Sequence, residues 1–295
     1  MITVMRTGLQ ATVQDLGRPH FGHLGVPESG AADPESLLRA NRLVGNAPGD
    51  AGIEFLLGRF AVRFDDAAVF VLAGAPLGAQ LDADPVAFGV RQYALAGQVL
   101  STAAPKAGIR TYLAVSGGID TPVLLGSRST DTLSGLGHPP LTDGTVLPVG
   151  EGRSIAPDVD YTVPPTVTAS GFLDVSIRMG PRDDLFTPEA VSELTSAIWT
   201  VTPDVDRIGV RLRGPKLIPS NGSGLATEGL AQGSIQVPSS GAPIVLLANH
   251  PPTGGYPVIA VVDRGDVPRI AQARPGTTIR FRALRRLEYS LDAPA

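Results

Sequence analysis

Short apolar runs, each bounded by glycine or proline, recur along the whole chain and limit its fold more than any other feature. Runs such as AVFVLAG at 68–74 and PVIAVVD at 257–263 have the length and the β-branched content of strands. In RIGVRLRG at 207–214, apolar residues take alternate positions, which is typical of a half-buried strand. The 35 Gly and 27 Pro are spread over the 295 residues, so they are interpreted as turns between strands.

Ten runs are predicted as strands, which makes the chain mainly β. They are ITVMRT, GIEFLLG, FAVRF, AVFVLAG, RTYLAVSG, LDVSIRMG, RIGVRLRG, PIVLLAN, PVIAVVD and TTIRFRAL. Two stretches, 34–44 and 188–198, have the spacing of amphipathic helices instead. Each follows a capping side chain, Asp33 or Thr187, and begins with proline, which suits the first helical position. Shorter helices are predicted at 266–274 and 85–90.

The two capped helices also suggest a duplication. The strand pattern GIEF begins 18 residues after Pro34 (52 − 34), and RIGV begins 19 residues after Pro188 (207 − 188). Two related β domains are therefore predicted, at 1–160 and 161–295, with the boundary in the proline-rich stretch 156–166 and with an exchange of segments between them allowed. The alternative is one large β domain whose two helices are alike by coincidence.

Composition excludes several classes of function. The net charge is −4 (24 − 28), so no nucleic-acid-binding surface is expected. The absence of cysteine removes thiol nucleophiles, disulfides and thiolate metal sites. The first residues lack the apolar core of a signal peptide, and the longest apolar runs have the length of strands rather than of membrane spans. A cytoplasmic protein without membrane contact is expected.

Motifs for bound cofactors are missing from the sequence. Neither Lys106 nor Lys216 stands in a P-loop that could hold ATP, and no Met-Lys dipeptide exists to carry biotin. His20 and His23 have a spacing that would suit a metal on a helix, but the glycines and the proline around them disfavour that helix. No metal site is predicted.

The stretch VQDLGRPHFGHLGVPESGAAD, at 13–33, holds the first group of candidate site residues. Gln14 and Asp15 follow the strand-like ATV, and Arg18 lies in the turn after them. A carboxylate and a guanidinium this close could hold an anionic substrate, or they could pair with each other and fix the turn. Asp33, at the end of the stretch, is interpreted first as a helix cap.

A second group lies in YLAVSGGID at 112–120 and in the following LLGSRSTD. Gly117 and Gly118 allow close approach of the backbone to a ligand. The hydroxyls, backbone N–H groups and guanidinium of residues 126–130 suit a carboxylate or a phosphate as the ligand. The alternative is a hydrogen-bonded surface loop. The candidate substrate-binding residues are Gly117, Gly118, Ser127, Arg128 and Ser129.

A third group lies in LLANHPPTGGYPVIAVV at 246–262, where two apolar runs flank a polar turn longer than a simple hairpin needs. His250 is the candidate acid or base, since histidine titrates near neutral pH. The alternative is a satisfied histidine at the end of a strand. Tyr256 is a further candidate for proton handling. The other candidate binding residues here are Asn249, Thr253, Gly254 and Gly255.

Five motifs in order resemble the biotin-dependent carboxyltransferase-like family, which is also known as allophanate hydrolase subunit 2, as KipA or as the C subunit of 5-oxoprolinase. The motifs are VQDLGRPHFGHLGVPESGAAD, NRLVGN, YLAVSGGID with LGSRST, GSIQVP and TGGYPVIAVV, and together they cover nearly the whole chain. The resemblance implies two tandem cyclophilin-like β-barrel domains with a few short helices. One departure is Asn249, at a position where the family is expected often to carry Asp. If that Asp is a catalytic base, the departure puts activity in doubt, because an amide cannot act as a carboxylate base.

The resemblance also implies an activity and partners. With a KipI-like subunit and a LamB/YcsF-like subunit, the chain would form an ATP-dependent 5-oxoprolinase that opens 5-oxo-L-proline to L-glutamate, the ATP being shared with or bound by a partner. Asp15, His250 and Tyr256 are expected to handle protons, and the remaining candidates to bind the substrate. One alternative is biotin-dependent carboxyl transfer of the urea carboxylase type, with biotin on another protein. Another is a non-enzymatic antagonist of a KipI-like protein.

Overall fold

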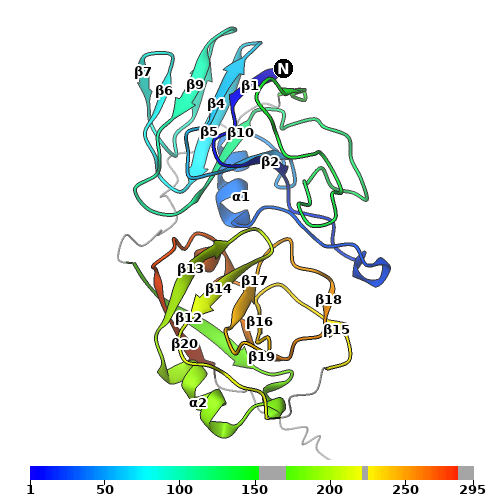
Figure 1. Cartoon of the computed structure of the whole chain (residues 1–295). Coiled ribbons are helices and arrows are strands. Elements are labelled where there is room, and N and C mark those ends of the chain that lie inside the picture. Colours follow the sequence, from blue (N-terminus) through cyan, green and yellow to red (C-terminus); the bar gives the residue numbers. More distant parts are fainter. Residues whose placement is uncertain (153–170, 221–224, 285–295) are drawn as a thin grey trace, which may run out of the picture.

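The computed structural model describes residues 1–152, 171–220 and 225–284. Residues 1–152 form one body, here called the first half, and residues 171–220 and 225–284 form a second, here called the second half (Figure 1). The boundary predicted between residues 160 and 161 lies outside the described residues, as does the stretch 156–166.

The first half consists of two antiparallel sheets. Its elements are β1 (Ile2–Arg6), β2 (Ala11–Gln14), η1 (Gly22–Leu24), α1 (Pro34–Leu43), β3 (Gly52–Leu56), β4 (Ala61–Phe64), β5 (Ala68–Gly74), β6 (Ala79–Leu81), β7 (Asp84–Val86), β8 (Gln92–Ala94), β9 (Val99–Thr102), β10 (Arg110–Val115) and β11 (Val146–Leu147). One sheet has the order β11-β1-β4-β9-β6-β7 and the other the order β2-β3-β10-β5-β8. Apolar side chains of both sheets form one core, in which the rings of Phe55 and Phe60 stack with their centroids 4.6 Å apart.

Helix α1 covers the outer face of the five-stranded sheet. Ala40 and Leu43 of the helix pack against Val71 on β5 and Ala114 on β10. Leu113, the neighbour of Ala114, points to the opposite face and enters the core between the sheets. Strand β10 is therefore buried on both faces, which explains why its sequence is apolar without a clear alternation.

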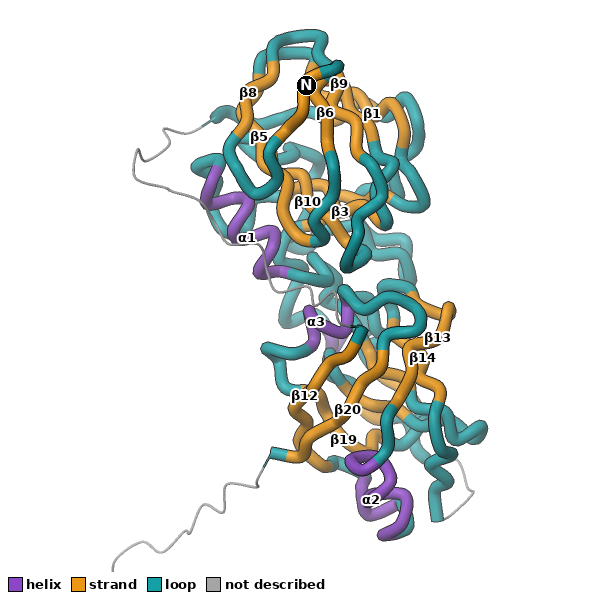
Figure 2. The backbone as a smooth tube through the Cα atoms, turned by 90° about the vertical axis from the view of Figure 1, so that its left-hand side faces the viewer, coloured by secondary structure: helices purple, strands orange, loops and turns teal. Residues whose placement is uncertain are grey.

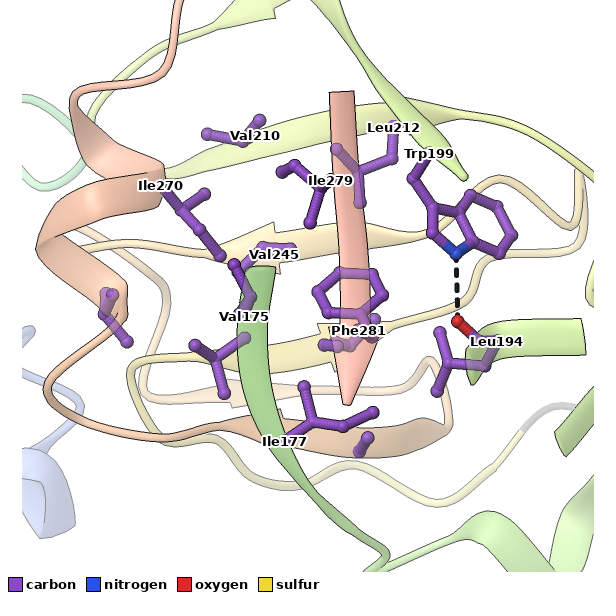
Figure 3. Packing of buried hydrophobic residues seen from close by; sticks show 14 of the residues in the cluster. Val175, Ile177, Leu194, Trp199, Val210, Leu212, Val245, Ile270, Ile279 and Phe281 are labelled. Atoms are coloured by element: carbon purple, nitrogen blue, oxygen red, sulfur yellow. Dashed lines mark hydrogen bonds between the residues drawn. The ribbon is translucent and has the colours of Figure 1, made fainter. Parts of the chain in front are cut away.

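The second half is built around a closed barrel of the order β12-β19-β16-β17-β14-β13-β20. Its elements are β12 (Phe172–Met179), η2 (Asp183–Leu185), α2 (Pro188–Ser196), β13 (Trp199–Val205), β14 (Gly209–Arg213), β15 (Glu228–Gly229), β16 (Ser234–Gln236), β17 (Ile244–Leu246), β18 (Thr253–Gly254), β19 (Val258–Val262), α3 (Val267–Ala271) and β20 (Thr278–Ala283). The barrel closes because β12 pairs in parallel with β20. Figure 3 shows the core, where the indole nitrogen of Trp199 donates to the carbonyl of Leu194 at 3.0 Å.

The structure confirms the mainly-β prediction and all ten predicted strands. The helices predicted at 34–44 and 188–198 are α1 and α2, and their caps are as expected: the Asp33 carboxylate accepts from the Ser36 amide at 3.2 Å, and the Thr187 hydroxyl accepts from the Ala190 amide at 3.2 Å. The prediction of a helix at 85–90 is wrong, because Asp84–Val86 is a strand paired with β6.

In the first half the described strands pair as two sheets, and the closed barrel is found in the second half.

None of the helices in the described ranges is long and apolar enough to span a membrane.

A buried ionic network joins the two halves. Arg207 of the second half donates to the carboxylate of Glu54 on β3, and the guanidinium of Arg110 on β10 lies 3.5 Å from the same carboxylate. The hydroxyl of Tyr112 donates to Glu54 at 2.7 Å. Burial acts to raise the pKa of Glu54, but the charges of Arg207 and Arg110 outweigh it and the pKa is lowered. The buried Glu54 carboxylate is therefore balanced by one guanidinium from each half.

Candidate functional site

Asp15 fastens the turn after β2 to the segment at 127–129. Its carboxylate accepts hydrogen bonds from the amide of Gly17 at 2.7 Å, the hydroxyl of Ser127 at 2.7 Å, the amide of Arg128 at 2.6 Å and the hydroxyl of Ser129. Asp15 is only 5% exposed. Both oxygens of this carboxylate are thus hydrogen-bonded within the protein, so Asp15 holds the turn and the segment at 127–129 together.

Arg18 is fully buried beside this turn. One terminal nitrogen of its guanidinium donates to the carbonyl of Ser129, while Nε and the other terminal nitrogen have no partner among the described residues. Burial lowers the pKa of Arg18, against the opposing effect of the nearby carboxylates of Asp15 and Asp131. Buried polar groups in native proteins almost always find a partner in the protein, in water or in a ligand. Two strong donors of Arg18 are therefore left for a molecule from outside the chain.

The same part of the first half holds further buried polar atoms without a hydrogen-bond partner among the described residues, namely Gln14 Oε1, Thr130 Oγ1 and Asp131 Oδ2. Of these residues, Asp131 is close enough to Arg18 for its charge to affect the pKa of the guanidinium. The amide nitrogen of Gln14 is engaged, since it donates to the carbonyl of Thr130 at 3.0 Å. We name this group, Gln14, Asp15, Arg18, Ser127, Ser129, Thr130 and Asp131, the Arg18 cluster. The cluster offers both donors and acceptors, so it suits a polar ligand that has both.

Asn249 brings the second half to this cluster. Its side-chain oxygen accepts from Arg207 at 2.9 and 3.1 Å, and its nitrogen donates to the hydroxyl of Thr132 at 3.2 Å. The Ser29 hydroxyl lies 3.4 Å from the same oxygen and 3.0 Å from the carbonyl of Thr130. Asn249 of the third group therefore contacts Ser29, in the stretch that holds the first group, and Thr132, which follows the second group in the chain.

His250 lies next to Asn249 and is 5% exposed. Its Nδ1 is 2.8 Å from the carbonyl oxygen of Pro251. Because a carbonyl only accepts, Nδ1 carries a hydrogen, and Nε2 is the ring nitrogen without a hydrogen-bond partner among the described residues. The geometry is that of a histidine able to accept a proton through Nε2.

Gly117 and Gly118 have positive φ values of 95° and 70°. A Cβ on Gly117 would lie 2.0 Å from the carbonyl oxygen of Gly150, so the close backbone approach here is to another part of the chain. Arg128 pairs with Asp120 at 2.6 Å on the same side of the first half. Ligand binding by these three residues stays a prediction.

The remaining predicted residues lie on or next to a separate two-stranded sheet. Strand β18, which contains Thr253 and Gly254, pairs with β15, and a Cβ on Gly254 would lie 2.8 Å from Nε2 of Gln236. Gly255 follows, and Tyr256 is 51% exposed. No hydrogen bond links this two-stranded sheet to the Arg18 cluster within the described ranges, so its part in the site also stays a prediction.

Sequence reasoning missed Glu54, Arg110 and Arg207, which hold the site in place through Asn249. A signal was present, because Glu54 interrupts the apolar run GIEFLLG and a charge inside such a run needs a buried partner. The two histidines whose spacing was considered for a metal, His20 and His23, are in contact in the structure: Nδ1 of His23 lies 3.0 Å from the backbone carbonyl oxygen of His20.

Comparison with known proteins decides the family. Residues 24–283 match the family model described as carboxyltransferase domain, subdomain A and B. The chain belongs to this carboxyltransferase family. It is 36% identical over 290 residues to the C subunit of 5-oxoprolinase from Escherichia coli, a match that covers 95% of this chain and 90% of the relative. The protein of the same name from Haemophilus influenzae is 34% identical, with 96% and 91% covered.

The carboxyltransferase family also includes much longer relatives. The urea amidolyase of Saccharomyces cerevisiae is 30% identical over 95% of this chain, which spans only 16% of that protein. The crystal structure of the K. lactis urea amidolyase has a TM-score of 0.89 and 28% identity, with 96% of this chain and 19% of that chain covered. The fold thus occurs both as a separate protein and as one part of a large enzyme.

Proposed function

We propose that the chain is the C subunit of an ATP-dependent 5-oxoprolinase, which hydrolyses 5-oxo-L-proline to L-glutamate. The observation that carries this proposal is the match with the C subunit of the Escherichia coli 5-oxoprolinase, which extends along 90% of that separate protein. In this proposal the chain works in the cytoplasm, in a complex with a KipI-like subunit and a LamB/YcsF-like subunit.

The Arg18 cluster supports an amide as the ligand. A lactam presents a carbonyl oxygen, which can accept from the two unpaired donors of Arg18, and a ring N–H, which can donate to Oε1 of Gln14 or Oδ2 of Asp131. 5-oxo-L-proline also carries a carboxylate, and the charges of Asp15 and Asp131 beside the guanidinium disfavour that group there. In this proposal the lactam end of the substrate, not its carboxylate, therefore faces Arg18.

In this proposal the turn at 19–25, which directly follows Arg18 in the chain, opens to give a lactam access to the guanidinium. Arg18 itself is fully buried, whereas most residues of this turn are exposed. Closure of the turn over a bound lactam would exclude water from the amide and strengthen its hydrogen bonds to the guanidinium.

Proton transfer in this proposal falls to His250. Its Nε2 can take the proton of the attacking water, while Asn249, fixed by Arg207, holds the adjoining backbone. Asp15 is assigned to holding the turn, since its acceptors are occupied. ATP would supply the phosphoryl group that makes the stable lactam carbonyl open to attack. The chain has no P-loop, so in this proposal the nucleotide is either bound by a partner or shared with one through a site of another kind on this chain.

Reconstitution tests the proposal. The chain is mixed with its KipI-like and LamB/YcsF-like partners, ATP and 5-oxo-L-proline, and released L-glutamate is measured. We expect glutamate in the complete mixture only. If the mixture lacking this chain releases as much glutamate as the complete one, the chain does not belong to this enzyme.

A second function is favoured by the urea amidolyase relatives. Their similarity along nearly the whole of this chain would suit transfer of a carboxyl group from carboxybiotin to an amide such as urea. Calorimetry with a biotinylated carrier protein distinguishes this function from the first. A component of a 5-oxoprolinase should show no such binding.

A further inference from the structure

A cleft of about 760 Å³ lies where the two halves meet, away from the Arg18 cluster. Its walls come from α1 and the loop before β10 in the first half, and from α3 and the residues after it in the second. Figure 2 shows α1 and α3 facing each other across this boundary. The volume falls within the range of roughly 300–1,000 Å³ that small-molecule sites occupy.

Cations dominate the charged side chains of this cleft, although the chain as a whole carries a net charge of −4. The cations are Arg39, Lys106, Arg269 and Arg274, and the carboxylates are Asp33 and Glu35. Asp33 forms part of the floor, where it is only 3% exposed. Its carboxylate accepts from the Ser36 hydroxyl at 2.6 Å and from the Gln272 amide at 2.9 Å, so its acceptors are directed into the protein.

Two of the four cations have no carboxylate partner among the described residues. Arg39 pairs with Glu35 at 3.1 Å, and Arg269 pairs with Asp266 at 2.6 Å. By contrast, Arg274 donates only to carbonyl groups of the loop that carries Lys106, and the Lys106 ammonium group has no hydrogen bond or ion pair with any residue of the described ranges. Arg274 therefore holds that loop in place and leaves the charge of Lys106 free for a ligand.

We infer that this cleft binds a phosphate-bearing anion with an organic body, about the size of a nucleoside phosphate. Lys106 and Arg274 supply the charge that attracts the phosphates. Apolar side chains in the wall, among them Leu173 and Pro268, accept the organic part. The ATP of the proposed function is one such ligand, and to that extent the inference rests on the proposed function.

The lysine content of the chain makes a direct test possible. Lys106 and Lys216 are its only lysines, and Lys216 is exposed outside the cleft. The full chain is treated with acetic anhydride, and the acetylation rate of each lysine is read by mass spectrometry. The additions are ATP, tripolyphosphate, adenosine or nothing.

We expect ATP to slow acetylation of Lys106 by on the order of tenfold at about ten times its Kd, and to leave Lys216 unchanged. Stronger protection by ATP than by tripolyphosphate supports recognition of the phosphates and the organic body together. Equal protection by the two compounds overturns the part of the inference that concerns the organic body. The inference is overturned if neither compound protects Lys106, if both lysines are protected equally, or if adenosine protects as well as ATP.

A second measurement uses matched variants. Lys106→Ala should weaken ATP binding to the full chain about tenfold in calorimetry, whereas Lys216→Ala should leave it unchanged. An unchanged affinity in Lys106→Ala contradicts the inference. These readouts report binding to this chain alone. Failure of ATP to protect Lys106 would overturn this inference without affecting the release of glutamate by the complete mixture. Failure of the mixture to release glutamate would overturn the proposed function without affecting the protection of Lys106 by ATP.

Discussion

Arg207 and Glu54 form an ion pair across the two halves of the chain, with side chains only 1% and 5% exposed. Arg207 also donates to Asn249 and to the carbonyl of Gly30, so one guanidinium contacts the Glu54 network, the segment before α1 and the candidate site. The position of Asn249 and His250 relative to the Arg18 cluster therefore depends on this pair.

Removal of Arg207 should destabilise the whole chain. Arg207→Ala leaves the Glu54 carboxylate buried beside Arg110 alone, and loss of one partner of a buried pair costs about 3–5 kcal/mol. The free energy of unfolding in urea measures the loss. Arg178→Ala is the matched control, because Arg178 lies 3.8 Å from Asp263 at the surface, and such pairs contribute less than about 1 kcal/mol. Equal effects of the two substitutions would contradict a role of Arg207 in joining the halves.

The lowered pKa of Glu54 predicts how stability depends on pH. A carboxyl whose pKa is lower in the folded than in the unfolded chain stabilises the fold above its unfolded pKa, and this contribution is lost as the pH falls through the folded pKa. The free energy of unfolding should therefore decrease as the pH is lowered from about 4.5. In Glu54→Gln this part of the decrease should be absent. An acid dependence identical to that of the unsubstituted chain would show that Glu54 is not the group responsible.

Asp15 should matter more for stability than Arg18. Asp15→Ala leaves four donors without their acceptor, two of them backbone amides, and should cost about 2–4 kcal/mol. Arg18→Met removes one hydrogen bond and a buried charge whose other donors have no protein partner, so it should cost less. Urea unfolding of both variants tests the order. The reverse order would mean that Arg18 is the structural residue of the turn.

Asn249→Asp should not create a catalytic base. Because the side-chain oxygen at this position lies 2.9 Å from Arg207, an aspartate there would pair with the guanidinium. Glutamate release by the complete mixture should therefore be no higher than with the unsubstituted chain. A clear increase would show that a carboxylate at this position takes part in the chemistry and that Asn249 impairs it.

Local sequence patterns predicted the elements of the fold, but not the partners that they find. Caps, prolines and alternation identify α1, α2 and ten strands because each signal lies within one element. Strand β13 was missed because Pro203 interrupts it, and the structure accommodates this by a register shift between Val201 and Val205. The pairing of β12 with β20, which closes the barrel, joins residues far apart in the chain and has no local signal.

The same reasoning applies to the site. Asp15, Ser127 and Ser129 were candidates because of their type, and the structure brings them together. Whether a buried group serves the fold or a ligand depends on its partners, which one sequence does not reveal. Asp15 has four partners, whereas Arg18 lacks partners for two of its donors, and this difference separates their roles.

Glutamate release with Arg18→Met tests the central claim most directly. The variant is combined with the KipI-like and LamB/YcsF-like partners, ATP and 5-oxo-L-proline, with Arg213→Met, an exposed arginine of β14, as the control. We expect Arg18→Met to lower kcat/KM by about a hundredfold or more, through lost binding and orientation of the lactam, while its circular dichroism spectrum and assembly with the partners are unchanged. Activity equal to that of Arg213→Met in a correctly assembled complex would contradict the assignment of the Arg18 cluster as the lactam site.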